Sequence, residues 1–139
     1  MYKKLTSVED CASILNAQPV HVQSLQYKES RAGLEEQSSA VPRPINASRG
    51  VEQFKDLDGY AAQVGSVKGV LTISNTTTHL AGALDIPCVV IVDDGPVTTW
   101  HDHADTSPFY PTLKVVRRHN RDWKQCLEEG IKILNNVKR

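Results

Sequence analysis

The sequence lacks an excess of either charge, because its 16 Lys and Arg residues equal its 16 Asp and Glu residues in number. A neutral chain offers no basic face to nucleic acid or to an anionic membrane surface, so neither partner is expected. The sequence also lacks an apolar run long enough to span a bilayer, and no apolar stretch follows its N-terminal lysines. These absences predict a soluble, cytoplasmic protein.

Cysteine is scarce, with three widely spaced residues, Cys11, Cys88 and Cys126. An odd number at such spacing favours buried free thiols over disulfides or a zinc site. The sequence contains no Gly-x-Gly-x-x-Gly motif, no Walker loop and no Gly-x-Ser-x-Gly motif. The most familiar signals for dinucleotides, nucleoside triphosphates and serine hydrolases are therefore missing.

Helix and strand patterns alternate along the chain after residue 20. Helices are expected at 7–16, near 30–37, after Asp56, after Asn75 and after Asp122. Strands are expected at 20–26, at 70–73, at 88–92 and at 113–117, with a loop or short strand near 44–45. The run 88–92 is apolar on both faces, which is typical of a strand in the middle of a parallel sheet. We predict one α/β domain over residues 1–139, a Rossmann-like, doubly wound parallel sheet of four to five strands in the order 2-1-3-4-5, with helices on both faces.

Two of the expected helices carry a clear apolar stripe. In the helix capped by Asp56 the stripe consists of Leu57, Tyr60, Ala61, Val64 and Val67, and in the helix capped by Asp122 it consists of Trp123, Leu127, Ile131, Leu134 and Val137. Such stripes are expected to pack against the sheet.

A polar turn, residues 74–79 (Ser-Asn-Thr-Thr-Thr-His), separates the strand 70–73 from the next helix. Asn75 can serve as the N-cap, which leaves the amides of the three following threonines without intrahelical partners at the positive end of the helix dipole. Helix N-termini bind anions, and ligands of open α/β sheets lie outside the carboxyl ends of the strands. The turn is therefore a candidate phosphate site, although a turn that only caps its helix would have the same sequence.

His79 lies one helical turn after Thr76, so both side chains can reach the space above the helix N-terminus. The positive helix end disfavours an imidazolium, so His79 is expected to act as a neutral hydrogen-bond donor to a phosphate oxygen, or else to cap its own helix. The small residues Ala81, Gly82 and Ala83 are expected to let this helix lie close to the sheet.

The segment after the strand 88–92 holds further candidates. Asp93 and Asp94 follow that strand, where they would contact a sugar hydroxyl or Mg²⁺, or simply form a turn. The aromatic residues of this polar loop, Trp100, Phe109 and Tyr110, would cover a base or sugar ring, or pack the loop against the body. His101 and His103 alternate and, with Asp93, would make a metal-dependent hydrolase site, but no helical His-x-x-x-His supports one, so a solvated loop is favoured and no metal is expected.

The motif Asn75-Thr76-Thr77-Thr78-His79-Leu80-Ala81-Gly82-Ala83-Leu84-Asp85-Ile86-Pro87, preceded by the strand 70–73, resembles the nucleotide-sugar-binding motif of GT-B glycosyltransferases of the heptosyltransferase type. It is still more similar to the C-terminal domains of bacterial tetratricopeptide-repeat proteins related to O-GlcNAc transferase. The resemblance extends from about Val20 through the block 107–111 (Ser-Pro-Phe-Tyr-Pro) to the terminal helix, and so covers most of the chain.

The resemblance implies the donor-binding half of a GT-B fold, with a nucleoside diphosphate or nucleotide-sugar as ligand and no separate cofactor. It places the diphosphate at Asn75, Thr76, Thr77 and His79, and Thr78 is included as a candidate binding residue. It assigns no catalytic residue, and glycosyl transfer is expected only with a second Rossmann-like half from another domain or from a homo-oligomer. The alternative is a non-catalytic protein-interaction module derived from such a domain.

Overall fold

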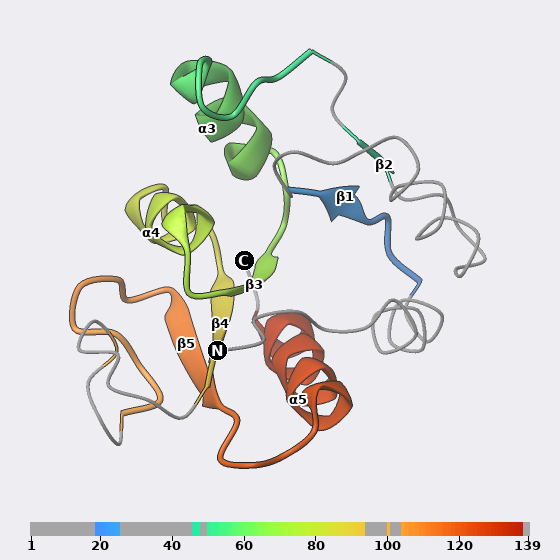
Figure 1. Ribbon diagram of the computed structural model, residues 1–139, viewed down its shortest axis with the longest axis vertical. Helices are drawn as coiled ribbons and strands as arrows, with labels where there is room; N and C mark the ends of the chain where they lie inside the picture. The colour runs from blue at the N-terminus through green and yellow to red at the C-terminus, as the bar shows by residue number, and fades with distance from the viewer. Residues whose placement is uncertain (1–18, 26–45, 48–49, 94–99, 101–103, 138–139) are drawn as a thin grey trace.

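Three parallel strands form the central sheet of the computed structural model, which describes residues 19–25, 46–47, 50–93, 100 and 104–137. They are β3 (Val70–Ile73), β4 (Cys88–Val92) and β5 (Leu113–Arg117), in the order β3-β4-β5 (Figure 1). All five residues of β4 are buried, as expected for a strand covered on both faces. The middle position predicted for β4 is confirmed.

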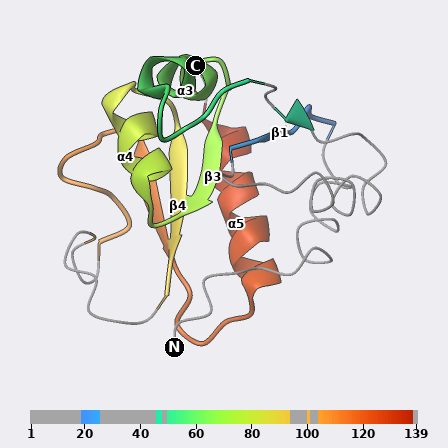
Figure 2. The same ribbon diagram turned by 45° about the horizontal axis from the view of Figure 1, so that its top comes forward.

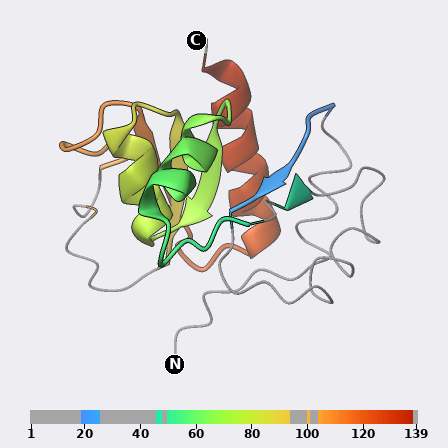
Figure 3. The same cartoon turned by 90° about the horizontal axis from the view of Figure 1, so that it is seen from above.

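Helices cover both faces of this sheet, as predicted. On one face lie α3 (Leu57–Gly65) and α4 (Thr76–Ala83), and on the other lies α5 (Trp123–Asn136) (Figures 2 and 3). Alternating strand residues point to the two faces, so β4 contributes Val90 to a core with α3 and α4 and Val89 to a core with α5. The chain is thus an α/β fold, compatible with a Rossmann-like architecture.

The prediction of four to five strands in one sheet is wrong for the described residues. β1 (Gln23–Ser24) and β2 (Asn46–Ala47) pair in parallel with each other, but they form a separate sheet of two strands. Of the predicted order 2-1-3-4-5, the pairing of the first strand with the third is therefore the one that is missing.

Side chains from α3 and from the segment before it donate hydrogen bonds to the carbonyl groups at the end of β1. The Leu25 carbonyl accepts hydrogen bonds from Gln53 Nε2 (3.0 Å) and from the Tyr60 hydroxyl (3.3 Å). The Ser24 carbonyl accepts one from Gln63 Nε2 (3.4 Å). The end of β1 is thus bonded to α3 and to Gln53, while β1 pairs with β2 and not with β3.

The helix caps predicted at Asp56 and Asp122 are confirmed. Asp56 Oδ1 accepts from the Gly59 amide (2.8 Å) and Asp122 Oδ1 accepts from the Gln125 amide (2.8 Å). The apolar stripes are wrong at their ends, because Leu57 is 63% exposed and Val137 is 43% exposed. Leu57 is the first residue of α3 and Val137 follows the last turn of α5, so neither reaches the sheet.

The helices expected at 7–16 and 30–37 and the strand near 44–45 lie outside the described residues. Among the residues that the structure does describe, no helix combines the length and apolar character needed to cross a membrane.

The C-terminus of α4 has the geometry of a Schellman motif. The Ile86 amide donates to the Ala81 carbonyl (2.9 Å) and the Asp85 amide donates to the Gly82 carbonyl (3.2 Å). Asp85 occupies the left-handed position, with φ of 55°. This conformation favours glycine, because a side chain there clashes with the following carbonyl.

Replacing Asp85 by glycine is therefore expected to raise the free energy of unfolding by about 1 kcal/mol, because glycine adopts this conformation without strain. The measurement is urea unfolding of the purified protein. Glu128→Gly, at an exposed position inside α5, is the matched control and should cost about 1 kcal/mol instead. A loss of stability on Asp85→Gly would contradict this account of the α4 ending.

The two cysteines within the described residues, Cys88 and Cys126, are buried free thiols, as predicted, whereas Cys11 lies outside them. Burial raises the pKa of the Cys88 thiol from 9.0 to about 12. The folded state thus holds this proton more tightly than the unfolded chain does.

We expect the free energy of unfolding to fall as the pH rises from 9 towards about 12, by on the order of 4 kcal/mol from Cys88 alone. This contribution is fully present below pH 9. Denaturant unfolding between pH 8 and 11 measures it, and Cys88→Ala should flatten the decline more than Cys126→Ala does. An equally steep decline in Cys88→Ala would contradict the assignment.

Candidate functional site

The predicted site lies where β3 passes into α4. The carboxyl ends of the three parallel strands meet at one edge of the sheet, since Ile73 pairs with Ile91 and Val92 pairs with Arg117. The turn at 74–75 and the start of α4 leave the sheet at this edge. The location is that expected of a ligand site in an open α/β sheet.

Asn75 and Thr78 use their polar groups to build the turn itself. Asn75 Oδ1 accepts from the Thr78 amide (3.3 Å), and the Asn75 amide donates to Thr78 Oγ1 (3.4 Å), which is a reciprocal capping box. The Thr78 hydroxyl also donates to the Ile73 carbonyl (3.0 Å), and its side chain is fully buried. Both side chains therefore stabilise the conformation of the turn.

Thr77 is anchored on the other side of the turn. Its Oγ1 lies 2.6 Å from the Tyr60 hydroxyl of α3, in a buried contact. Burial raises the pKa of the Tyr60 hydroxyl, while its hydrogen bond with Thr77 acts in the opposite direction. Tyr60 thus stays a neutral phenol that joins α3 to the start of α4.

The backbone amides of Thr76 and Thr77 are the unused donors of this helix start, within the described residues. Among the hydrogen bonds within the described residues, none uses either amide as a donor, whereas the next amide of the helix is taken by the Asn75 side chain. The Thr76 side chain is exposed. The helix start therefore presents two amides and one accessible hydroxyl at its positive end.

His79 follows one turn later and is held by two aromatic rings. Its Nδ1 lies 3.1 Å from the Tyr110 hydroxyl. Its ring stacks on that of Trp100, with centroids 5.4 Å apart and planes 20° apart, and meets the Tyr110 ring edge to face at 5.8 Å. The imidazole is thereby fixed in orientation beside the helix start.

Trp100 faces the protein. It is only 2% exposed, and its indole N–H donates to the Ser74 hydroxyl (2.9 Å). Its carbonyl accepts from the Arg117 guanidinium (2.6 Å). Of the two interpretations of Trp100, packing of the loop is the one that this geometry favours.

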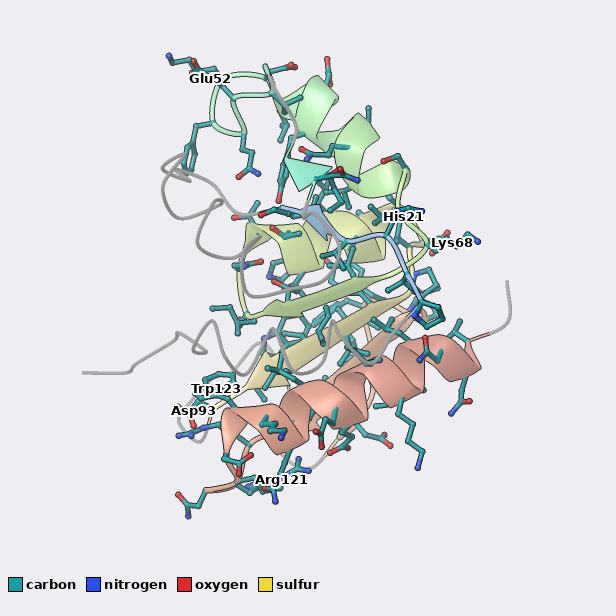
Figure 4. The ribbon with its side chains drawn as sticks, turned by 90° about the vertical axis from the view of Figure 1, so that its right-hand side faces the viewer. His21, Glu52, Lys68, Asp93, Arg121 and Trp123 are labelled. Atoms are coloured by element: carbon teal, nitrogen blue, oxygen red, sulfur yellow. The ribbon has the colours of Figure 1, made fainter. Side chains whose placement is uncertain are left out.

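Asp93 carries an ion pair. Its two carboxylate oxygens accept from Arg118 Nε (2.8 Å) and from the second terminal nitrogen of the same guanidinium (3.3 Å). Arg118 also lies over the Trp123 ring, 5.2 Å from its centroid. Figure 4 shows Asp93 and Trp123 together at the start of α5. Asp93 therefore contributes to an ion pair at the carboxyl end of β4.

Asp94, His101 and His103 lie outside the described residues, so the hydrolase hypothesis stays a prediction. Within the described part of the chain, no three His, Cys, Asp or Glu side chains are grouped closely enough to hold a metal ion.

An open cavity of about 360 Å³ lies at the carboxyl end of β5 and does not include the start of α4. Its described lining consists of Ala104, Asp105, Val115, Arg117, His119 and Arg121. None of the predicted binding residues is among these six, so we do not place the diphosphate there. Phosphate recognition at a helix start needs exposed amides rather than a deep cavity.

Tyr110 is the contact of the site that the sequence did not predict. It is 31 positions from His79 in the chain, and no local spacing connects the two. The signal in the sequence was that Tyr110 is one of several aromatic residues in a polar loop, which predicted a cover for a base or sugar ring, or packing of the loop, but no contact with His79.

Comparisons with known proteins found no matching family model, and neither a curated protein nor a solved structure matched this chain significantly. The functional argument therefore rests on the geometry of the site and on the sequence motif.

Proposed function

We propose that this domain binds a nucleoside diphosphate or nucleotide-sugar at the start of α4. The observation that carries the proposal is the pair of amides at Thr76 and Thr77, which have no acceptor within the described residues. They stand at the positive end of a helix that leaves the carboxyl edge of a parallel sheet. Phosphate oxygens are strong acceptors that match both the donors and the dipole.

Neighbouring side chains support an anionic ligand larger than a single phosphate. The Thr76 hydroxyl is accessible, and His79 lies one turn further along the same helix. A diphosphate spans the distance between a helix start and a side chain one turn away, so each phosphate has its own donors. The motif's resemblance to nucleotide-sugar sites is the reason to propose a nucleoside as the rest of the ligand.

The proposal is limited to binding. The Asn75, Thr77 and Thr78 side chains are engaged in the turn, and none of them is proposed to react. Glycosyl transfer would require an acceptor site from a second Rossmann-like half or from another copy of the chain.

Calorimetric titration with UDP, GDP and ADP, and with sugars of each nucleotide, tests the proposal. We expect saturable binding of at least one of them. His79→Ala should weaken it, and Thr76→Ala should weaken it less, because the amide is retained. An absence of binding to all of these ligands at millimolar concentration would refute the proposal.

A second candidate is a protein-interaction module, and it rests on two apolar side chains at the start of α3. Phe54 is 74% exposed and Leu57 is 63% exposed, three positions apart. A contiguous exposed apolar patch marks a protein-interaction site, and these two side chains are the ones that this candidate would use to form one. The titration separates the two candidates, since a module without a nucleotide site would bind none of the ligands.

A further inference from the structure

We propose that Tyr110 is a positioning residue for the anion site, holding His79 so that Nε2, as an N–H donor, is the nitrogen presented to a phosphate. This inference rests on the proposed function for the identity of the ligand. Its structural part concerns Tyr110, His79, Gly82 and Trp100, and it can be tested without any ligand.

A notch in α4 seats the Tyr110 ring. Gly82 lies one turn after His79 on the same side of the helix, and a Cβ atom at Gly82 would overlap the ring and Cβ atoms of Tyr110. The prediction that Ala81, Gly82 and Ala83 bring the helix onto the sheet is thus wrong for Gly82, whose missing side chain makes room for Tyr110. Ala81 is fully buried in the core, and Ala83 is exposed.

From this notch the Tyr110 hydroxyl reaches Nδ1 of His79 at 3.1 Å. A phenol O–H is a more acidic donor than an imidazole N–H, so the arrangement in which Tyr110 donates and Nδ1 accepts is favoured. A neutral imidazole whose Nδ1 accepts carries its proton on Nε2. The contact therefore selects one tautomer of His79.

Trp100 restricts the same ring from its face. The near-parallel stack of Trp100 on His79 limits tilting, and the edge contact with Tyr110 limits rotation. No hydrogen bond to Nε2 occurs among the described residues. Nε2 thus remains as the donor for an anion bound at the helix start, with its direction set before the ligand arrives.

Nitrogen-15 NMR of the histidine ring in the ligand-free protein tests the positioning. In the wild type, the two ring nitrogens of His79 should report a proton on Nε2 and a hydrogen-bonded Nδ1. Tyr110→Phe should shift the Nδ1 resonance, because that nitrogen loses its donor. Gly82→Ala should do the same through displacement of the ring, with the hydroxyl still present.

Tyr60→Phe is the matched control, because it removes a second tyrosine hydroxyl that, within the described residues, contacts α4, at Thr77 rather than at His79. It should leave the His79 resonances unchanged. A wild-type proton on Nδ1, or an Nδ1 resonance that does not move in Tyr110→Phe, would overturn the proposed positioning.

Titration with UDP then tests the consequence for binding. We expect Tyr110→Phe to weaken affinity by about three- to tenfold, the range for one hydrogen bond, and its effect should largely disappear in a His79→Ala background. Equal affinities of wild type and Tyr110→Phe would overturn the role in binding. The two proposals can fail separately. If the wild type binds no nucleotide but Tyr110→Phe still shifts the Nδ1 resonance of His79, the proposed function is wrong and the positioning of His79 by Tyr110 is supported.

Discussion

Replacing Trp100 by alanine is expected to lower the free energy of unfolding by about 3–5 kcal/mol, among the largest effects of any single substitution in this domain. The ring is 2% exposed in the core shared by α3, α4 and the sheet. Its loss would leave a cavity, remove the stack on His79 and leave the Ser74 hydroxyl without its indole partner. Chemical denaturation followed by far-UV circular dichroism measures the effect.

Two further variants serve as controls for Trp100→Ala. Trp100→Phe keeps most of the apolar ring and should recover more than half of the lost stability. Phe109→Ala removes a ring that is 65% exposed and should change the unfolding free energy by no more than about 0.5 kcal/mol. If Trp100→Ala were as mild as Phe109→Ala, Trp100 would not belong to the core.

Replacing Thr76 by proline is expected to weaken nucleoside diphosphate binding by about ten- to a hundredfold, the range for one hydrogen bond to a charged group, while leaving the fold intact. Proline is tolerated at the first position of a helix, where no intrahelical bond uses the amide. Thr76 is that first residue, and the preceding Asn75 is extended (φ of −159° and ψ of −177°), as a residue before proline prefers. The substitution thus removes one amide donor together with the Thr76 hydroxyl, and it is compatible with the backbone of the helix start.

Thr76→Ala is the matched variant, because it removes the hydroxyl and keeps the amide. The ratio of the dissociation constants of the two variants, measured by calorimetry, isolates the contribution of the backbone donor. Unfolding midpoints of the two variants should agree within a few degrees. Equal affinities in the proline and alanine variants would show that the amide does not contact the ligand.

The parts of the fold that follow from local sequence were predictable. The apolar run of β4 requires burial on both faces, and the Asp56, Asn75 and Asp122 caps each satisfy amides three residues away. These interactions depend on near neighbours in the chain. Their structures were therefore predicted with correct type and position.

The parts that depend on distant residues were not. The end of β1 is bonded to side chains 28–39 positions away, at the carbonyls of Ser24 and Leu25, and the local sequence does not indicate these contacts. The contact of Tyr110 with His79 depends on a notch at Gly82 that no periodicity indicates.

The sequence indicated where polar groups gather at the sheet edge, but not which of them bond within the protein, and the predicted ligand class stays a proposal. The sequence placed five adjacent residues, Asn75 to His79, at the ligand. In the structure, the side chains of Asn75, Thr77 and Thr78 bond within the protein, because a sharp turn at the sheet edge leaves its polar groups partly buried and they need partners. The backbone of Thr76 and Thr77, the Thr76 hydroxyl and the His79 ring remain for an anion.

The most direct measurement is a titration of the nitrogen-15-labelled protein with UDP, followed by the amide resonances of Thr76 and Thr77. If the helix start holds a diphosphate, both amide protons should shift downfield in a saturable manner, while that of Lys132, on the exposed side of α5, should not move. Saturable binding that leaves the Thr76 and Thr77 amides unchanged, or no binding at millimolar UDP, GDP or ADP, would contradict the proposed site.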